Sequence, residues 1–138
     1  MGSDSRLFKS YPLIFRAAGN LHHYQHSPIA HRGIECGEGW YPIIEDMAAW
    51  LEGEASALKA AGKRPPVIVQ VKEKFGTLTV HVGGFPVKRY FSELRPRLDA
   101  AIERSKTVCE ICGASGTFRE DGWARTRCDK CEAEKAKA

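Results

Sequence analysis

The sequence predicts an α+β fold in which two helices pack on a small antiparallel β-hairpin sheet, with a four-cysteine zinc ribbon at the C-terminus. Three observations predict it: a helical apolar pattern, two strand-like segments joined by a short turn, and two Cys-x-x-Cys pairs near the end of the chain. With 138 residues, the chain can hold one domain of about a hundred residues and an appended module. We expect an α+β domain over residues 1–105 and the zinc ribbon, with a frayed tail, over residues 106–138.

The first predicted helix covers about residues 42–61. Apolar side chains recur there at steps of three and four, and Gly62 ends the pattern. The second predicted helix covers about residues 95–105, because Pro96 is tolerated only in a first helical turn, and residues 87–94 are expected to form a looser lead-in. The segment before the first helix is expected to be irregular.

The predicted hairpin covers about residues 67–82, with its turn over residues 74–77. Apolar and polar positions alternate along it, which is the period of a strand with one buried and one wet face. Two helices against the buried face give a layered α+β domain. The face expected to pack inward carries Val67, Val69, Val71, Leu78, Val80 and Val82, and the other face carries Gln70, Lys72, Thr77, Thr79 and His81.

Four cysteines have the spacing of a structural zinc site: Cys109, Cys112, Cys128 and Cys131. Two residues between paired cysteines let the backbone curl, so that both sulfurs face one point. Residues 116–127, between the pairs, are predicted to form a hairpin with Asp121-Gly122 at its tip. The alternative is two disulfides, but a fifth cysteine would be left over, and no apolar signal-peptide segment opens the chain. We therefore predict one structural Zn²⁺ ion.

The size of the ribbon also favours a metal. A module of about thirty residues is too small to be held together by an apolar core alone. Structural zinc in such modules contributes roughly 10 to 16 kcal/mol of apparent binding free energy at neutral pH. Four thiolates fill the tetrahedral shell and leave no position for water or substrate. The metal is thus expected to stabilise the ribbon and not to catalyse a reaction.

A glycine-rich loop over residues 33–42 is the other concentration of unusual residues, with three glycines, two carboxylates, one thiol and two aromatics. One interpretation is a structural loop that delivers Trp40 to the core, with Cys36 buried as a small apolar residue. A second interpretation is a further metal site, with Cys36, Glu38 and His31 as candidate ligands. In a third, Cys36 is the nucleophile of a thiol-dependent enzyme.

Charge is distributed unevenly along the chain. Residues 35–62 are mainly acidic and residues 63–97 mainly basic, so the two segments either neutralise each other or the basic one forms an anion-binding surface. The formal charge of +4 falls to about +2 when four thiolates bind one Zn²⁺, which supports nucleic-acid binding only weakly. The candidate binding surface comprises Lys72, Lys74, Thr79, His81, Arg119 and Arg125; direct nucleic-acid binding would also use Arg89 and Arg127, with Phe118 or Trp123 as a stacking plane.

The sequence lacks the characteristic motifs of several enzyme classes. No Walker or dinucleotide-binding glycine pattern is present. Residues 113–127 contain no histidine, which a nuclease built on paired cysteine knuckles requires, and all five histidines precede residue 82. No run approaches eighteen apolar residues, so we expect a soluble intracellular protein.

Three segments carry a resemblance to a known group: residues 34–41 (IECGEGWY), 71–78 (VKEKFGTL) and 105–113 (SKTVCEICG). Their order resembles that of small bacteriophage and prophage zinc-ribbon proteins of unassigned function, over about residues 11–131. That group has further cysteines before the glycine-rich loop, where this chain has Ser27-Pro28-Ile29-Ala30-His31. A second metal or redox role of those cysteines would be lost here.

The resemblance implies a phage accessory protein in the cytoplasm of a bacterial host cell. We expect a non-enzymatic protein that binds a host or phage macromolecular complex, for example to inhibit a host defence or transcription machine. Zinc ribbons often serve as rigid docking surfaces that lose little entropy on binding. The alternative is direct nucleic-acid binding, and the third hypothesis is a thiol-dependent enzyme that uses Cys36.

Overall fold

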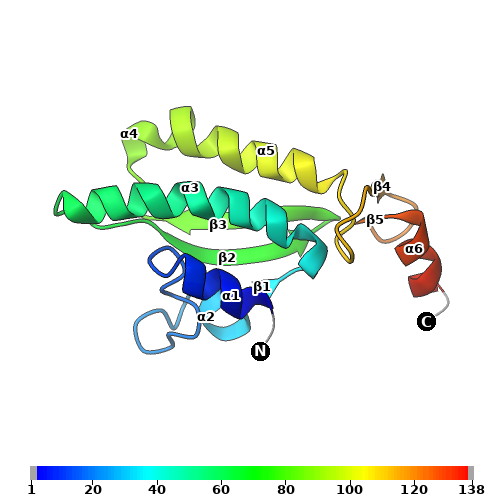
Figure 1. Ribbon diagram of the computed structural model, residues 1–138, viewed down its shortest axis with the longest axis horizontal. Helices are drawn as coiled ribbons and strands as arrows, with labels where there is room; N and C mark the ends of the chain where they lie inside the picture. The colour runs from blue at the N-terminus through cyan, green and yellow to red at the C-terminus, as the bar shows by residue number, and fades with distance from the viewer. Residues whose placement is uncertain (1–2, 137–138) are drawn as a thin grey trace.

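Two helices and a β-hairpin form the body of the protein, and the computed structural model describes residues 3–136 (Figure 1). Helices α3 (Tyr41–Ala60) and α5 (Arg95–Ser105) run alongside strands β2 (Val67–Lys74) and β3 (Thr77–Gly83). These are the two helices and the hairpin that the sequence predicts, at nearly the same boundaries. The mixed helix and strand character expected from the sequence is therefore confirmed.

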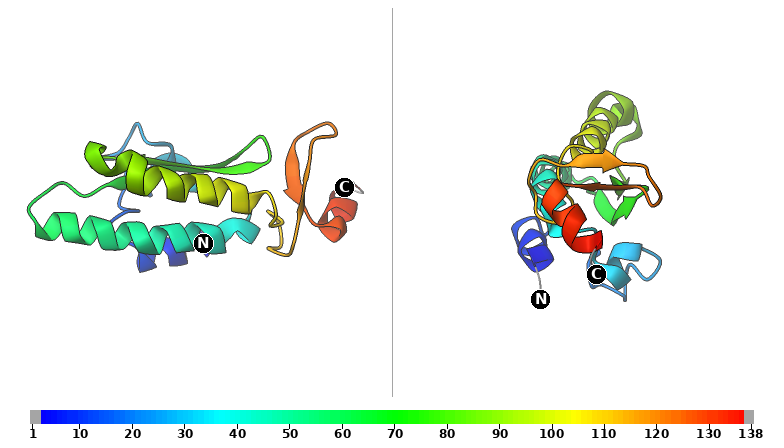
Figure 2. Two further views of the ribbon diagram at one scale, coloured as in Figure 1. Left: turned by 90° about the horizontal axis from the view of Figure 1, so that it is seen from above. Right: turned by 90° about the vertical axis from the view of Figure 1, so that its right-hand side faces the viewer.

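Shorter elements complete the architecture. In chain order they are α1 (Ser3–Ser10), α2 (Pro28–Arg32), β1 (Ile34–Glu35), the 3-10 helix η1 (Glu38–Trp40), α4 (Val87–Arg89), the π-helical turn η2 (Tyr90–Leu94), β4 (Thr117–Arg119), β5 (Arg125–Arg127) and α6 (Asp129–Ala136). The segment from α4 to η2 is the looser lead-in expected before α5. At the opposite end of the body, residues 106–136 form a C-terminal lobe that contains β4, β5 and α6 (Figure 1, Figure 2).

Helix α3 begins and ends where residue type favours it. Pro42 occupies the first turn, where a missing N–H costs no hydrogen bond, and Gly62 takes a positive φ of 77° just past the end. Its buried face carries Ile44, Leu51 and Ala55. Within residues 3–136, neither α3 nor any other helix combines the length and the apolar character needed to cross a membrane.

Helix α5 is fastened to the edge of the sheet at its C-terminal end. The buried Ser105 Oγ accepts a hydrogen bond of 3.0 Å from the Leu78 N–H on β3 and donates one of 2.6 Å to the Ile102 carbonyl. These hydrogen bonds join β3 to the last residue of α5, after which the chain enters the C-terminal lobe.

A β-bulge in β2 alters the expected pattern of faces. Ile68 pairs with Val82, and Val71 pairs with Val80, with a register shift between Ile68 and the next pair. Cross-strand partners share a face, so Ile68 and Val71 both point inward and Val69 is the extra residue. Ile68 is fully buried and Val69 only half-buried. The expectation that Val69 simply alternates inward with Val71 is therefore wrong, because alternation cannot anticipate an inserted residue.

The N-terminal segment, expected to be irregular, contributes to the core. Helix α1 buries Leu7, and the loop after it buries Ile14 and Phe15. The Ile68 N–H donates a 2.8 Å hydrogen bond to the Ile14 carbonyl, which ties this segment to β2. Strand β1 also pairs in parallel with β2. The sheet is therefore three-stranded and mixed, in the order β1-β2-β3, and the expectation of a purely antiparallel hairpin sheet is wrong.

The acidic segment is paired partly with the N-terminal segment and partly with residues of the basic segment and α5. Arg6 pairs with Glu45, and the Glu52 carboxylate accepts hydrogen bonds from two backbone N–H groups of the loop after α1. Arg89, in the basic segment, pairs with Glu54 of the acidic segment. Arg89 thus helps to join the two segments within one body and is engaged in an ion pair.

Candidate metal centre

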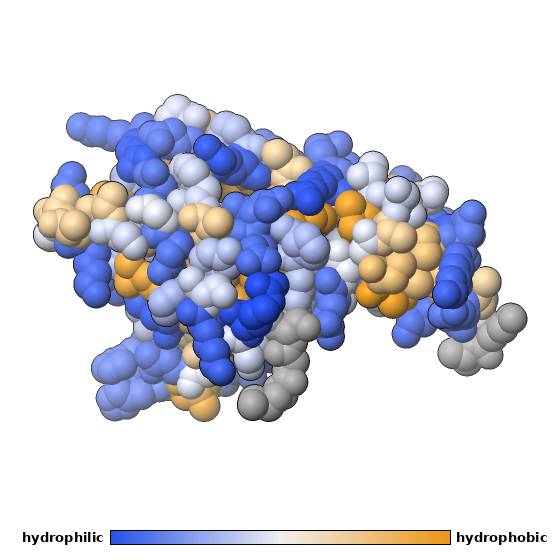
Figure 3. Space-filling view, in the orientation of Figure 1, coloured by the Kyte–Doolittle hydropathy of each residue, from blue (hydrophilic) through white to orange (hydrophobic). Residues whose placement is uncertain are grey.

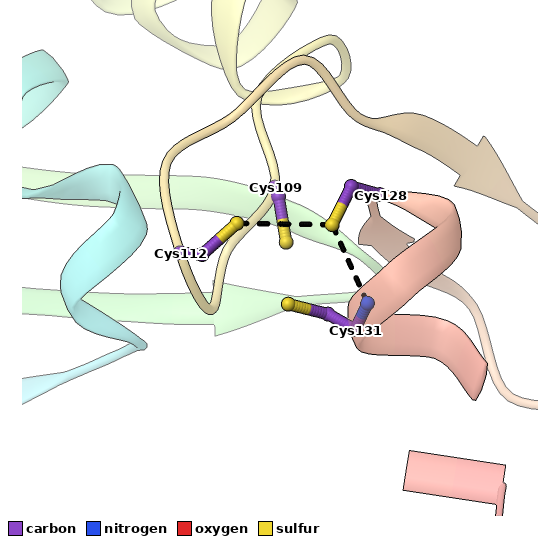
Figure 4. A group of neighbouring side chains, drawn as sticks. All are labelled: Cys109, Cys112, Cys128 and Cys131. Atoms are coloured by element: carbon purple, nitrogen blue, oxygen red, sulfur yellow. Dashed lines mark hydrogen bonds between the residues drawn. The ribbon is translucent and has the colours of Figure 1, made fainter. Parts of the chain in front are cut away.

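Four cysteine side chains from two separate segments converge in the C-terminal lobe (Figure 4). Cys109 and Cys112 lie in the loop after α5, Cys128 lies just before α6, and Cys131 lies in the first turn of α6. Their sulfur atoms all lie within 4.8 Å of one another. Cys109 and Cys131 are buried, while Cys112 is exposed. The cluster can therefore hold a metal ion.

One sulfur–sulfur distance matches that expected around a tetrahedral zinc ion. With Zn–S bonds of about 2.3 Å, the edge of the tetrahedron is about 3.8 Å. The sulfurs of Cys112 and Cys128 are 3.7 Å apart. Thiolate ligands favour zinc over hard cations such as Mg²⁺ and Ca²⁺, which prefer oxygen. The donor set thus fits the ion expected from the sequence.

Backbone N–H groups also point at the sulfurs. The Cys131 N–H donates to the Cys128 sulfur at 3.4 Å. Burial opposes ionisation of Cys109, but backbone N–H groups of both Cys-x-x-Cys pairs outweigh it and lower the pKa of this thiol to about 6. The hydrogen bond to Cys128, followed by burial, raises the pKa of Cys131 to about 12. One thiolate is thus favoured before metal binds, and a divalent cation displaces the remaining protons.

The backbone leaves the two Cys-x-x-Cys pairs in different conformations. After Cys112, Gly113 adopts a positive φ of 85°, and its N–H donates a 2.9 Å hydrogen bond to the Cys109 carbonyl. After Cys128, the chain enters α6 directly, and the Glu132 N–H donates to the Cys128 carbonyl at 3.0 Å. The second pair continues as a helix and therefore needs no glycine at its exit.

The exposed side of the first Cys-x-x-Cys loop is apolar. Figure 3 shows a group of apolar residues over the loop between α5 and β4, on a face that is otherwise largely hydrophilic. Ile111, which lies between the first two cysteines, is among the exposed large apolar side chains. The metal cluster therefore lies beside an apolar surface.

Between the two cysteine pairs, β4 and β5 form the hairpin that the sequence predicts. The strands pair in antiparallel register, from Thr117 opposite Arg127 to Arg119 opposite Arg125. Gly122 takes a positive φ of 85° in the turn, as expected for the tip. The hairpin thus carries the chain from the first cysteine pair to the second.

The arginine side chains of this hairpin are engaged inside the lobe. Arg119 pairs with Asp129 at 2.9 Å, and Arg125 and Arg127 pair with Glu132 at 2.5 and 3.2 Å. The hydrogen bond from Arg125 holds the pKa of the Glu132 carboxyl down at about 2. The side chains of Arg119 and Arg125 are only 20% and 15% exposed. Both arginines were expected on a binding surface. In the structure they pair with acidic residues of α6 and so hold α6 against the hairpin.

The glycine-rich loop packs against the first Cys-x-x-Cys pair. The Gly39 N–H donates a 2.8 Å hydrogen bond to the Glu110 carbonyl, and the Gly37 N–H donates one of 2.9 Å to the Glu110 side chain. The fully buried Trp40 donates from Nε1 to the Val108 carbonyl at 2.8 Å. These contacts fix the C-terminal lobe to the body of the protein.

Replacing Gly39 with alanine is expected to weaken this attachment. A Cβ at Gly39 would overlap the Cys109 carbonyl oxygen and lie 2.6 Å from the Gly113 nitrogen, so the backbone must shift. Overpacking of this kind typically costs about 1–3 kcal/mol, which urea unfolding measures. In the matched control Gly53→Ala, the Cβ meets nothing within 4 Å, and alanine inside α3 should stabilise by roughly 0.5–1 kcal/mol. Equal effects of the two variants would contradict the close contact.

A second contact joins the lobe to the turn between β2 and β3. The buried Thr126 Oγ1 donates a 2.8 Å hydrogen bond to the Gly76 carbonyl. Gly76 has a positive φ of 83°, and a Cβ there would lie 2.8 Å from the backbone nitrogen of Arg125. The turn therefore needs glycine both for its backbone conformation and for its close approach to β5.

The candidate second site at Cys36, Glu38 and His31 does not assemble into a group of three ligands. Over the described residues 3–136, the four C-terminal cysteines are the only cluster of three or more ligating side chains close enough for one metal. The His31 Nε2 lies 2.5 Å from the Gln25 carbonyl oxygen. Cys36 packs against the hydrophobic core. Neighbouring positions in the sequence thus do not converge in space here.

Cys36 has the environment of an unreactive thiol. Burial, reinforced by the negative charges of Glu110 and Glu73, raises its pKa to about 12. At pH 8 only about one such thiol in ten thousand would be ionised, and the thiolate is the reactive form. We expect iodoacetamide to label Cys36 far more slowly in the folded protein than in guanidinium, as mapped by mass spectrometry. Rapid labelling of the folded, metal-loaded protein would reveal an accessible and ionised Cys36.

The remaining residues of the expected binding surface lie together on the outer face of the β2-β3 hairpin. Lys72 and Thr79 are opposite each other, and Lys74 and His81 occupy the same face. Lys74 and His81 are exposed, and the other two are half-buried. The surface expected from the sequence therefore divides into an exposed sheet face and an internal network of arginines.

No protein-family model, curated protein or solved structure matches this chain. Four sulfurs form the chemical centre of the site, and the glycine-rich loop supports it. Sequence reasoning misses the contact between this loop and the first cysteine pair. In the sequence, only Gly37 and Gly39 hint at this contact, because the absence of a side chain at these positions lets Glu110 come close.

Proposed function

We propose that this chain is a non-enzymatic zinc-binding protein of phage origin that binds a macromolecular complex of the host or the phage. In this proposal, residues 106–136 form a zinc ribbon around one Zn²⁺ ion held by the four cysteines. The observation that carries it is the convergence of four sulfurs from two separate segments, all within 4.8 Å. The metal is structural, since four thiolates leave no open coordination position.

The burial pattern of the C-terminal lobe supports a structural metal. Of residues 106–135, only Cys109, Thr126 and Cys131 are fully buried, and two of these are candidate ligands. Without a fully buried large apolar side chain, a lobe of this size has too little hydrophobic stabilisation to fold by itself. Zinc coordination provides free energy of the required order, roughly 10 to 16 kcal/mol at neutral pH.

The state of the reactive side chains supports binding over catalysis. The C-terminal cysteines face one another, burial raises the pKa of Cys36, and the arginines of β4 and β5 are paired with acids. Two exposed surfaces are available to a partner: the outer face of β2 and β3, and the apolar side of the first cysteine loop (Figure 3). A rigid surface of this kind loses little entropy when a partner binds.

The phage context comes from the resemblance of three segments, which lie together in the folded chain. Ile34 of the first segment pairs with Val71 of the second. Leu78 of the second donates to Ser105 of the third, and the glycine-rich loop contacts the first cysteine pair. The residues that carry the resemblance therefore form one continuous unit and not three unrelated motifs.

Affinity capture from a bacterial host lysate tests the proposal. The zinc-loaded protein is expected to retain a defined complex, and protein stripped of metal by a chelator is expected to lose it, because the lobe no longer folds. Nuclease or protease treatment of the captured material then assigns the class of the partner. Failure to capture any complex, or equal capture by the zinc-loaded and zinc-free forms, would contradict the proposed function.

A further inference from the structure

An exposed aromatic cleft lies where the β2-β3 turn meets the tip of the β4-β5 hairpin. Its volume is about 450 Å³, and Phe75 and Trp123 line it from the two sides. Phe75 is 75% exposed and Trp123 is 82% exposed. Two large aromatic side chains presented across one cleft differ from single scattered surface residues, and contiguous exposed apolar surface is a common feature of binding sites. The other lining residues are Glu73, Lys74, Gly122 and Ala124.

The backbone is strained where it presents Phe75. Within the described part of the chain, Phe75 is the only residue other than glycine with a positive φ, of 52°. The turn formed by Phe75 and Gly76 has the backbone of a type I′ hairpin, whose first position favours Asn, Asp or Gly. Those residues would adopt it at lower cost, so the turn alone does not account for a phenylalanine at this position. The Lys74 Nζ lies 5.8 Å from its ring centroid, which places a cation beside the aromatic face.

The two walls of the cleft are held in place before any ligand arrives. Phe75 lies on the turn of the body, and Trp123 lies at the tip of the lobe hairpin. The hydrogen bond from Thr126 to the Gly76 carbonyl joins the two elements next to the cleft. A preformed platform of this kind binds with little ordering cost. It also depends on the metal, because the lobe supplies the Trp123 wall.

The sheet face that borders the cleft is basic. The ionisable side chains on the outer face of β2 and β3 are Lys72, Lys74 and His81, and Lys74 also lines the cleft. Lys72 and Lys74 are two residues apart on one strand, about 7 Å, which is comparable with the step between phosphates of an extended single strand. Glu35, which lies beside Lys72 on β1, is already paired with Arg32. The face is therefore complementary to a polyanion.

We propose that this cleft binds single-stranded nucleic acid, with bases stacked on both Phe75 and Trp123 and the adjoining phosphates on Lys74 and Lys72. Aromatic stacking planes beside a basic track are the common chemistry of proteins that bind single strands without sequence preference. A duplex keeps its bases stacked internally and cannot offer them to the cleft. The inference rests on the proposed function, because the zinc-held lobe forms one wall.

Fluorescence anisotropy on the zinc-loaded protein tests this inference. Labelled dT and rU strands of about 15 nucleotides, near the upper end of known site sizes, and a matching duplex are titrated at low salt. Phe75→Ala and Trp123→Ala should each weaken single-strand binding by about tenfold or more, the usual effect of losing one stacking plane. Both side chains are exposed, so both variants should retain zinc and fold. Phe91→Ala is the matched control, because Phe91 is 76% exposed on η2 at the other end of the body.

Salt dependence tests the phosphate contacts separately. Each contact to a single strand contributes about 0.7 to the slope of log K against log salt. Replacing Lys72 and Lys74 together with glutamine is therefore expected to lower the slope by about 1.4. Lys88→Gln, at an exposed position on α4 away from the cleft, should leave the slope unchanged.

Three results would overturn the inference: zinc-loaded protein that does not bind single strands at low salt, binding that survives both alanine variants, or a preference for duplex. A protein partner captured through Phe75 and Trp123 in the absence of nucleic acid would also overturn it. In each case the zinc ribbon would still stand. Purified chain without bound zinc would instead contradict the proposed function, so the two failures are distinguishable.

Discussion

Replacing Cys109 with serine is expected to remove zinc from the protein and to unfold residues 106–136. Cys109 is fully buried within the sulfur cluster, and a serine hydroxyl is a poor ligand for a site built from thiolates. Loss of structural zinc removes roughly 10 to 16 kcal/mol of apparent binding free energy. Metal analysis measures the zinc content, and amide NMR spectra report which residues lose their structure. The body, with its own hydrophobic core, should stay folded.

The matched control for this substitution is Cys36→Ser, the same change at a thiol outside the cluster. It should keep one zinc ion per chain and a folded C-terminal lobe. Loss of zinc from Cys36→Ser, or a folded lobe in zinc-free Cys109→Ser, would contradict a centre made of the four C-terminal cysteines.

Replacing Trp40 with alanine is expected to destabilise the body and to loosen the C-terminal lobe together. Trp40 is fully buried, and its Nε1 donates to the Val108 carbonyl just before the first metal ligand. Removing a buried tryptophan side chain typically costs about 3–5 kcal/mol. Urea unfolding followed by circular dichroism gives the free energy, and hydrogen exchange of residues 106–116 reports the loosening.

Two further variants separate packing from hydrogen bonding at this position. Trp40→Phe keeps most of the ring and removes the donor, so the unpaired Val108 carbonyl should cost about 1–3 kcal/mol. Trp123→Ala removes the same side chain at an exposed position and should change stability by no more than about 0.5 kcal/mol. If Trp40→Ala cost no more than Trp123→Ala, Trp40 would not be the anchor between the body and the lobe.

The sequence predicts the strongly periodic elements and misses those without a period. Helix α3 is predicted by apolar residues at steps of three and four, and the β2-β3 hairpin by alternating apolar and polar residues. The bulge at Val69 inserts a single residue, which leaves no mark in the pattern beyond a run of valine and isoleucine. Strand β1 has two residues, too few for any period, and its parallel pairing is set by tertiary contacts.

The candidate metal centre follows from spacing alone, whereas its surroundings do not. Two residues between paired cysteines constrain the local chain enough to predict convergence. The roles of Arg119 and Arg125 depend on Glu132 and Asp129 folding back in α6, which charge counting cannot show. The separation of Cys36 from His31 likewise depends on the path of the chain, because neighbours in sequence can point to different sides of a fold.

X-ray absorption spectroscopy at the zinc edge, on protein purified without added metal, tests the central claim most directly. A structural zinc ribbon predicts one zinc ion per chain with four sulfur neighbours at about 2.3 Å. A spectrum fitted by nitrogen or oxygen ligands, or a preparation that carries no tightly bound transition metal, would contradict it.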